Sequence, residues 1–87
     1  MKLFYCIKCQ DIVRPYPGKT RSCECGNLTV TPHPDNITVE YSGDNVIPIG
    51  FNNSSFLLAA KNQPEDGWGK SFEAFIIPKQ TKTIIKT

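Results

Sequence analysis

The four cysteines of this 87-residue chain all lie in its first third, where they form two close pairs. Cys6 and Cys9 are separated by two residues, and Cys23 and Cys25 by one. Thiolates are soft ligands, and two of them a few residues apart can hold one ion from a tight turn. The spacing therefore predicts a single metal site with Cys6, Cys9, Cys23 and Cys25 as its ligands. Zn²⁺ is the expected ion, and iron is left open.

The predicted metal site has a closed coordination shell. Four thiolates complete the tetrahedral coordination of zinc and leave no position for water, so the expected role of the zinc is structural. Two disulfides are the competing arrangement, but a bridge between Cys23 and Cys25 would be strained. Gly26 follows the second pair and permits the sharp turn that this short spacing needs. His33 stands between two prolines and is expected to be a solvated loop residue.

Length and composition indicate one small folded domain. At 87 residues a hydrophobic core alone leaves a thin stability margin, which a metal site would increase. The 39% of hydrophobic residues is ordinary for a globular protein, and the net charge of +2 is low for one that tracks a nucleic-acid backbone. The sequence shows neither a signal-peptide pattern nor an apolar run approaching a membrane span. We therefore expect a cytoplasmic protein that does not contact a membrane.

The fold predicted from these patterns is α+β, a small and mainly antiparallel β domain with an N-terminal four-cysteine zinc ribbon and one short helix. Short strands on either side of each cysteine pair give the element order of a zinc ribbon. The stiff segment Thr31–Pro34 is the best boundary behind it. The prediction is a single domain, 1–87, with a zinc-ribbon subdomain at 1–31 and a ββαβ subdomain at 35–87.

The second subdomain is predicted from periodicity and turn residues. Ile37–Tyr41 alternates apolar and polar residues, and the turn residues after it predict a hairpin into Val46–Ile49. Pro48 lacks an N–H group, which places this second strand at a sheet edge or ends it there. A short helix is expected over Phe56–Gln63. The most apolar segment, Ser71–Ile77, is predicted to be a well-buried strand.

Two segments that flank the predicted helix are candidate ligand-binding residues. The polar segment before the helix offers either ordinary helix caps or N–H groups that suit an anion. The loop after the helix carries an indole that either covers the small core or contacts a nucleobase or a protein partner. Because they flank one helix, the two segments could line one pocket; their residues are Asn52, Asn53, Ser54 and Ser55, followed by Trp68, Gly69 and Lys70.

Catalysis has little support in the sequence. The chain has one histidine, no phosphate-binding loop, no nucleophile motif and no closely paired acids in a predicted element. We therefore predict that the protein is not an enzyme.

The two knuckles resemble those of the zinc-ribbon superfamily over the first third of the chain. They read C-I-K-C from Cys6 to Cys9 and C-E-C-G from Cys23 to Gly26, the second being shorter than the usual ribbon knuckle. The whole chain is similar to small uncharacterised zinc-ribbon-type proteins of phages and bacteria, which have segments like Gly50–Ser55 and Gly67–Phe75. This resemblance implies an accessory or counter-defence factor, located in the cytoplasm of the bacterial host if a phage encodes it.

The leading prediction is a non-enzymatic, zinc-stabilised binding protein that binds a protein partner or sequesters a small nucleotide-like anion. One alternative is a nucleic-acid-binding zinc-ribbon regulator that uses basic residues and a tyrosine of the first third, namely Lys8, Arg14, Tyr16, Lys19 and Arg21. A second alternative is a structural subunit of a larger assembly. Whether the protein forms homo-oligomers is left open.

Overall fold

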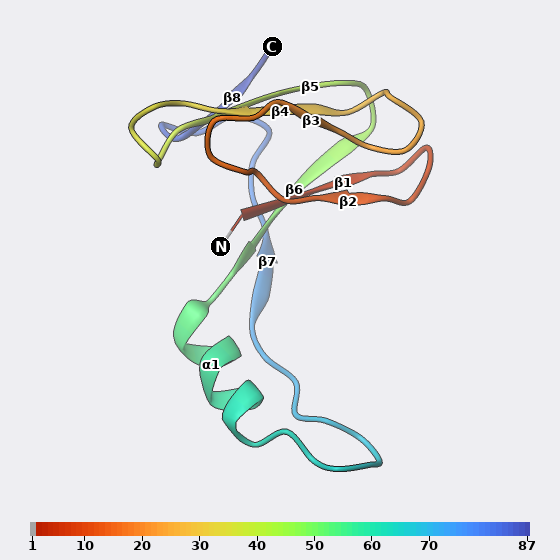
Figure 1. The fold of residues 1–87 in the computed structure, drawn as a ribbon, viewed down its shortest axis with the longest axis vertical. Coiled ribbons are helices and arrows are strands. Elements are labelled where there is room, and N and C mark those ends of the chain that lie inside the picture. The colour runs from red at the N-terminus through yellow and green to blue at the C-terminus, as the bar shows by residue number, and fades with distance from the viewer. Residues whose placement is uncertain (1) are drawn as a thin grey trace.

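The computed structural model describes residues 2–87 and contains two four-stranded β-sheets and one helix (Figure 1). The predicted class, a small and mainly antiparallel β domain with one short helix, is confirmed. The elements in chain order are β1 (Lys2–Cys6), β2 (Ile12–Val13), β3 (Arg21–Ser22), β4 (Thr29–Pro32), β5 (Val39–Ser42), β6 (Val46–Phe51), α1 (Asn53–Lys61), β7 (Ala74–Ile76) and β8 (Ile84–Lys86). Within these residues no helix has the length and apolar character needed to cross a membrane.

The two sheets are built from strands that are far apart in the sequence. The first has the order β2-β1-β6-β7 and the second the order β3-β4-β5-β8. All neighbouring strands are antiparallel except β5 and β8, which are parallel. Each sheet thus combines strands from 1–31 with strands from 35–87, and the two predicted subdomains share one core.

The core lies between the two sheets, which are stacked in the upper part of the molecule (Figure 1). Phe4 from β1 contacts Tyr41 from β5, with ring centroids 5.0 Å apart. The Tyr41 hydroxyl donates a 2.6 Å hydrogen bond to the carbonyl of Lys79, so its polar end is satisfied although the residue is buried. The buried hydrophobic residues of the described chain are Phe4, Cys6, Val13, Cys23, Leu28, Val30, Val39, Tyr41, Val46 and Ile84.

The predicted hairpin between Ile37–Tyr41 and Val46–Ile49 is wrong. β5 pairs with β4 and β8 in the second sheet, whereas β6 pairs with β1 and β7 in the first. Gly43, with φ of 124°, lies in the turn that carries the chain from one sheet to the other. Alternation correctly identified the half-buried strand at β5, but it does not distinguish a strand that pairs beside β5 from one that belongs to the opposite sheet.

Pro48 lies in a strand inside the sheet rather than at an edge, because β6 has β1 on one side and β7 on the other. Its carbonyl accepts a hydrogen bond from the Ile77 N–H at 3.0 Å. In an antiparallel strand the N–H and C=O of one residue face the same neighbour. The missing N–H of Pro48 therefore faces β7, just beyond the last residue of that strand. The pairing of Pro48 with Phe4 on β1 is unaffected.

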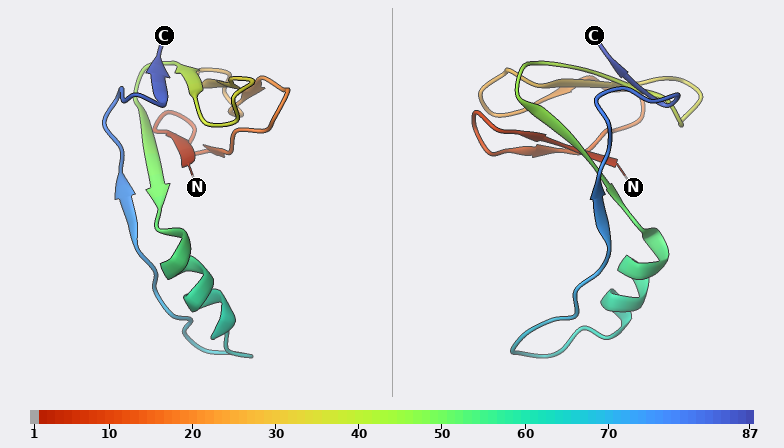
Figure 2. Two further views of the ribbon diagram at one scale, coloured as in Figure 1. Left: turned by 90° about the vertical axis from the view of Figure 1, so that its left-hand side faces the viewer. Right: turned by 180° about the vertical axis from the view of Figure 1, so that it is seen from behind.

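Residues 51–76 form an arm that extends away from the head, which comprises residues 2–50 and 77–87 (Figure 2). Within the arm the rings of Phe51, Phe56 and Phe72 pack together with centroids 5.1 to 6.2 Å apart. Helix α1 has no buried residue. The predicted buried strand at Ser71–Ile77 is wrong, since β7 covers only Ala74–Ile76 and all three of its residues are exposed. These apolar residues are exposed because β7 lies in the arm, which extends away from the core between the two sheets.

Candidate metal centre

The two cysteine pairs lie in two turns that belong to different sheets. Cys6 ends β1, and Cys9 lies in the turn that leads to β2. Cys23 and Cys25 lie in the turn between β3 and β4. The first turn connects strands of one sheet and the second connects strands of the other, so the cysteine cluster joins the two sheets at one end of the head.

Both turns are closed in the same way, by the residue that follows the second cysteine. The N–H of Gln10 donates to the Cys6 carbonyl at 2.7 Å, and the N–H of Gly26 donates to the Cys23 carbonyl at 3.0 Å. Gln10 has φ of 60° and Gly26 has φ of 79°. Glycine adopts this left-handed conformation without steric cost, as the sequence predicted for Gly26. Gln10 adopts it with a side chain, which carries a modest energetic cost.

The four sulfur atoms lie within 4.8 Å of one another. The Cys6 and Cys25 sulfurs are 3.8 Å apart, and those of Cys23 and Cys25 are 3.5 Å apart. A tetrahedral ion with metal–sulfur bonds of about 2.3 Å needs sulfurs about 3.8 Å apart. All four residues are free cysteines. The structure therefore brings together the predicted ligands in an arrangement that could hold one metal ion.

Hydrogen bonds from the chain support the thiolates. The Leu28 N–H donates to the sulfur of Cys23 at 3.3 Å. The Asn27 side-chain amide lies 3.8 Å from the sulfur of Cys6 and donates to the Asp44 carbonyl at 2.6 Å. Donors aimed at sulfur favour its ionised form, which is the form that binds a metal.

The cysteine thiols of the cluster differ in their pKa values. Burial opposes ionisation of Cys23, but the Leu28 N–H and the neighbouring thiols outweigh it and lower the pKa of Cys23 to about 6. The N–H of Asn27 favours the Cys25 thiolate, but desolvation of the sulfur and the three sulfurs beside it raise the pKa of Cys25 to about 12. Cys25 is exposed as a residue, yet its sulfur faces the other three. Negatively charged thiolates at the sulfur–sulfur distances of this cluster repel one another, and a bound cation would neutralise that repulsion.

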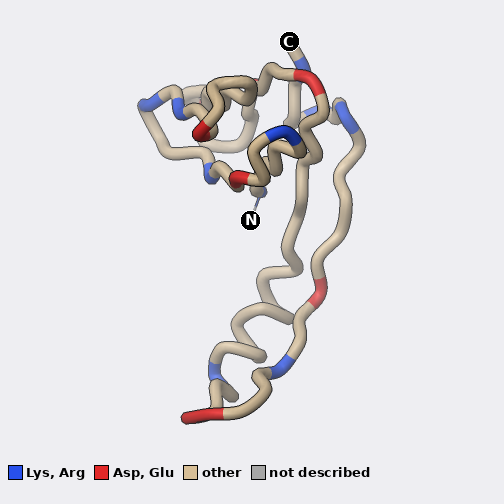
Figure 3. The backbone as a smooth tube through the Cα atoms, turned by 90° about the vertical axis from the view of Figure 1, so that its right-hand side faces the viewer, with Lys and Arg blue, Asp and Glu red and all other residues tan. Residues whose placement is uncertain are grey.

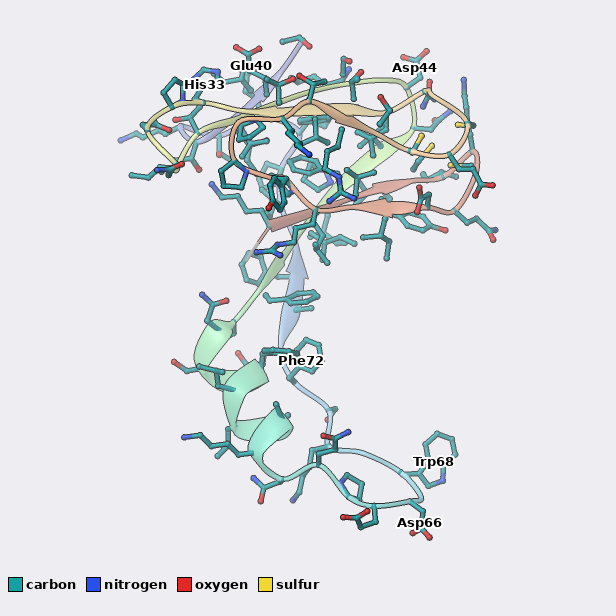
Figure 4. The ribbon with its side chains drawn as sticks, in the orientation of Figure 1. His33, Glu40, Asp44, Asp66, Trp68 and Phe72 are labelled. Carbon is teal, nitrogen blue, oxygen red and sulfur yellow. The ribbon has the colours of Figure 1, made fainter. Side chains whose placement is uncertain are left out.

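His33 is not part of the cysteine cluster. Its Nε2 lies 2.8 Å from Oε1 of Glu40, and Figure 4 shows this pair at the end of the head opposite the sulfur atoms. Four sulfur ligands already complete a tetrahedral shell. The geometry therefore supports a structural metal centre with a closed shell.

The candidate ligand segments lie at opposite ends of α1. Oδ1 of Asn52 accepts the Ser55 N–H at 3.0 Å and caps the helix, while Oγ of Ser55 accepts the Glu73 N–H at 2.8 Å. Gly69 and Lys70 lie near the other end of α1, beside a surface hollow of about 310 Å³. Neither Trp68 nor any residue of Asn52–Ser55 lines this hollow, so the two segments do not share it; its lining is completed by Phe56, Ala59, Ala60, Gln63, Pro64 and Phe72.

Three of the five candidate nucleic-acid residues, Arg14, Tyr16 and Lys19, lie on the loop between β2 and β3, and a fourth, Arg21, begins β3. Tyr16, Lys19 and Arg21 line a surface hollow of about 380 Å³. Nζ of Lys19 lies 5.7 Å from the centroid of the Tyr16 ring, and Nη1 of Arg21 donates to the Arg14 carbonyl at 3.2 Å. Lys8 lies apart from them, in the turn of the first cysteine pair at the other end of the β1–β2 hairpin.

Sequence reasoning missed two features of possible functional weight. The first is Asn27, whose only sequence signal is its position directly after the second knuckle. The second is the exposed apolar surface of the arm, part of which, Ser71–Ile77, the sequence assigns to a buried strand. The chain matches no protein-family model, no curated protein and no solved structure.

Proposed function

We propose that this protein is a zinc-stabilised protein-binding module, in which zinc holds the head together and the arm binds a protein partner. The observation that carries this proposal is the apolar surface of the arm. No residue of α1 is buried, and several large apolar side chains of the arm are exposed, namely Leu57, Leu58, Trp68, Phe72, Phe75 and Ile76.

The size of this surface fits a protein interface. Trp68 is 98% exposed, Ile76 68% and Leu58 65%. Summed over all sides of the arm, the six side chains expose on the order of 600 Å² of apolar surface, taking roughly 150–250 Å² for a whole aromatic side chain. A specific interface buries about 800 Å² per partner. A tryptophan at the end of such a surface is the residue type that most often dominates binding energy.

Zinc is the proposed ion because four thiolates gathered within 4.8 Å of one another suit zinc and iron, and both knuckles resemble those of the zinc-ribbon superfamily. Its proposed role is to join two small sheets whose shared core is thin. Direct metal analysis of the purified protein distinguishes zinc from iron.

A protein partner is favoured over a nucleotide-like anion by the contacts at the helix start. Asn52 and Ser55 bond each other and the returning chain at Glu73, so their polar groups already have partners. Binding of a nucleotide-like anion stays a prediction. Calorimetry with a panel of nucleotides tests it, with Trp68→Ala and Lys70→Ala as comparison variants. The counter-defence role that the resemblance implies is one use of a protein-binding arm.

Site-specific photo-crosslinking tests the proposed function. A photoreactive amino acid is placed at Leu58 or at Trp68, and at Lys8 on the head as the matched exposed control. In extracts of cells that contain the protein, we expect discrete crosslinked products from both arm positions and none of these from position 8. Identical products from all three positions, or none from the arm, would contradict the proposal.

A second candidate function is nucleic-acid binding by Tyr16 and Lys19 of the β2–β3 loop together with Arg21 of β3, because these three residues gather around one hollow. Stacking on tyrosine with cationic contacts to phosphate is a common mode of single-strand binding. A gel-shift assay at low salt, repeated with Lys19→Ala and Arg21→Ala, tests it. Affinity that falls steeply with salt supports this function, and the absence of any shift rejects it.

A further inference from the structure

The edge of the first sheet is formed by β7, which has β6 on one side and no strand on the other among the described residues. The Glu73 carbonyl accepts the Asn52 N–H, and the Ile77 N–H donates to the Pro48 carbonyl. Residues 73, 75 and 77 therefore direct their backbone groups toward β6. Backbone groups alternate in direction along an antiparallel strand, so those of Ala74 and Ile76 point to the open edge.

This open edge is apolar as well as unpaired. Ala74, Phe75 and Ile76 are all exposed, and the views in Figure 2 show the outer side of the strand without a neighbouring segment. Exposed apolar edges with free N–H and C=O groups are templates for another strand, and stable proteins cover or charge them. The strand is therefore suited to pairing with a partner strand.

We propose that β7 pairs in antiparallel fashion with β7 of a second copy of this chain, across a two-fold axis at Ile76. This inference rests on the proposed protein-binding role of the arm and names its partner. In this register Ile76 faces Ile76 of the second copy, and their N–H and C=O groups bond reciprocally. Phe75 faces Ile77, and Glu73 faces Lys79, each of these pairs occurring twice.

Two features favour this register: the side chains that share one face of the strand and the opposite charges that meet across the pair. Phe75 and Ile77 lie on the same face, because a Cβ at Gly50 would come within 2.5 Å of the Phe75 ring and 3.2 Å of Cδ1 of Ile77. Glu73 directly precedes β7, and Lys79 lies in the bend beyond Pro78 that follows it. The proposed register brings these two residues opposite each other, so a carboxylate meets an ammonium at both ends of the paired strands. A register centred on Phe75 instead would place Glu73 against Ile77 and lose both charge pairs.

The antiparallel arrangement also places each arm beside the head of the other copy, since β7 runs from the arm toward the head (Figure 1). The arm tip is acidic, with Glu65 and Asp66 in its loop (Figure 3). The C-terminal stretch of the head carries three lysines and no acid, namely Lys79, Lys82 and Lys86. The pairing thus brings the acidic tip loop of each arm, which Lys61 and Lys70 flank, toward the basic C-terminal stretch of the other head.

Sedimentation and covalent trapping test the pairing. We expect the wild-type protein to reach twice its 9.7 kDa mass as its concentration is raised. In the metal-loaded Ile76→Cys variant, the two new cysteines have Cα atoms about 5.5 Å apart, the spacing of a hydrogen-bonded pair, which suits a disulfide. Mild oxidation should give a covalent dimer. Ala74→Cys is the matched control, since its symmetry mate is four residues out of register, about 14 Å away.

A charge exchange tests the register independently. Glu73→Lys and Lys79→Glu should each raise the dissociation constant roughly tenfold, since each turns two attractive cross-strand pairs into repulsive ones. The double variant should restore dimerisation. Metal content and circular dichroism confirm that each variant is folded.

Three results would overturn the pairing: a monomeric wild-type mass at every soluble concentration, equal oxidation of the Ile76→Cys and Ala74→Cys variants, or no rescue in the double variant. A monomer whose Trp68 position crosslinks to a different protein rejects the second copy and retains the proposed function. A monomer without arm crosslinks rejects both.

Discussion

Replacing Cys23 with serine removes one of the four sulfurs of the candidate metal centre and should abolish the folded state. Cys23 is buried at the turn of β3 and β4, and its sulfur accepts the Leu28 N–H. The metal ion would join the turns of two different sheets. Its loss therefore frees the two sheets from each other at the end where all four cysteines lie.

The expected magnitude follows from the thin core of the head. Only ten hydrophobic residues of the described chain are buried, and two of them are the candidate ligands Cys6 and Cys23. A domain of this size has a net stability at or below the usual ~5–15 kcal/mol. Structural zinc contributes roughly 10–16 kcal/mol in small metal domains. Loss of even half of that contribution would remove most or all of the stability.

The assay is thermal unfolding followed by circular dichroism, with metal content measured on the same samples. We expect Cys23→Ser, and the wild-type protein in excess chelator, to lose the cooperative transition. Ser22→Ala is the matched control, because this exposed neighbour lies outside the sulfur cluster and should change stability by less than about 0.5 kcal/mol. A metal-free protein that unfolds at the wild-type temperature would refute the assignment of a stabilising metal.

Other substitutions test the packing of the head and the exposure of the arm. Gly43→Ala should be strongly destabilising, by more than about 2 kcal/mol, because its Cβ would overlap the Asn27 carbonyl and its φ is 124°; chemical denaturation measures this. Tyr41→Phe should cost about 1 kcal/mol by leaving the Lys79 carbonyl without its donor, and an unchanged denaturation midpoint would contradict that bond. Trp68→Ala should leave stability within about 0.5 kcal/mol of wild type, because the side chain is exposed, while weakening partner capture in the crosslinking assay.

Local features were predictable because short-range chemistry decides them. The spacing of the cysteines was enough to predict their cluster, since a tight turn brings two thiols together and one ion requires both pairs. The predicted helix is present, although it spans Asn53–Lys61 and begins earlier than Phe56. Asn52 supplies the cap that the polar residues before the helix suggested.

Strand partners and surface exposure were decided only by the tertiary structure. Alternation shows which residues of β5 face inward, but the pattern is the same whether the next strand of the chain pairs beside β5 in a hairpin or joins the opposite sheet. The sequence predicts that Pro48 lies at a sheet edge or ends its strand, because it cannot donate a hydrogen bond to a neighbour. Which neighbour its missing N–H faces depends on the order of the strands, and only the tertiary structure decides that order. The apolar residues of α1 and β7 indicate a surface that is more stable when it is covered. Whether the rest of this chain or another molecule covers that surface depends on the direction of the arm, which the sequence of the arm does not determine.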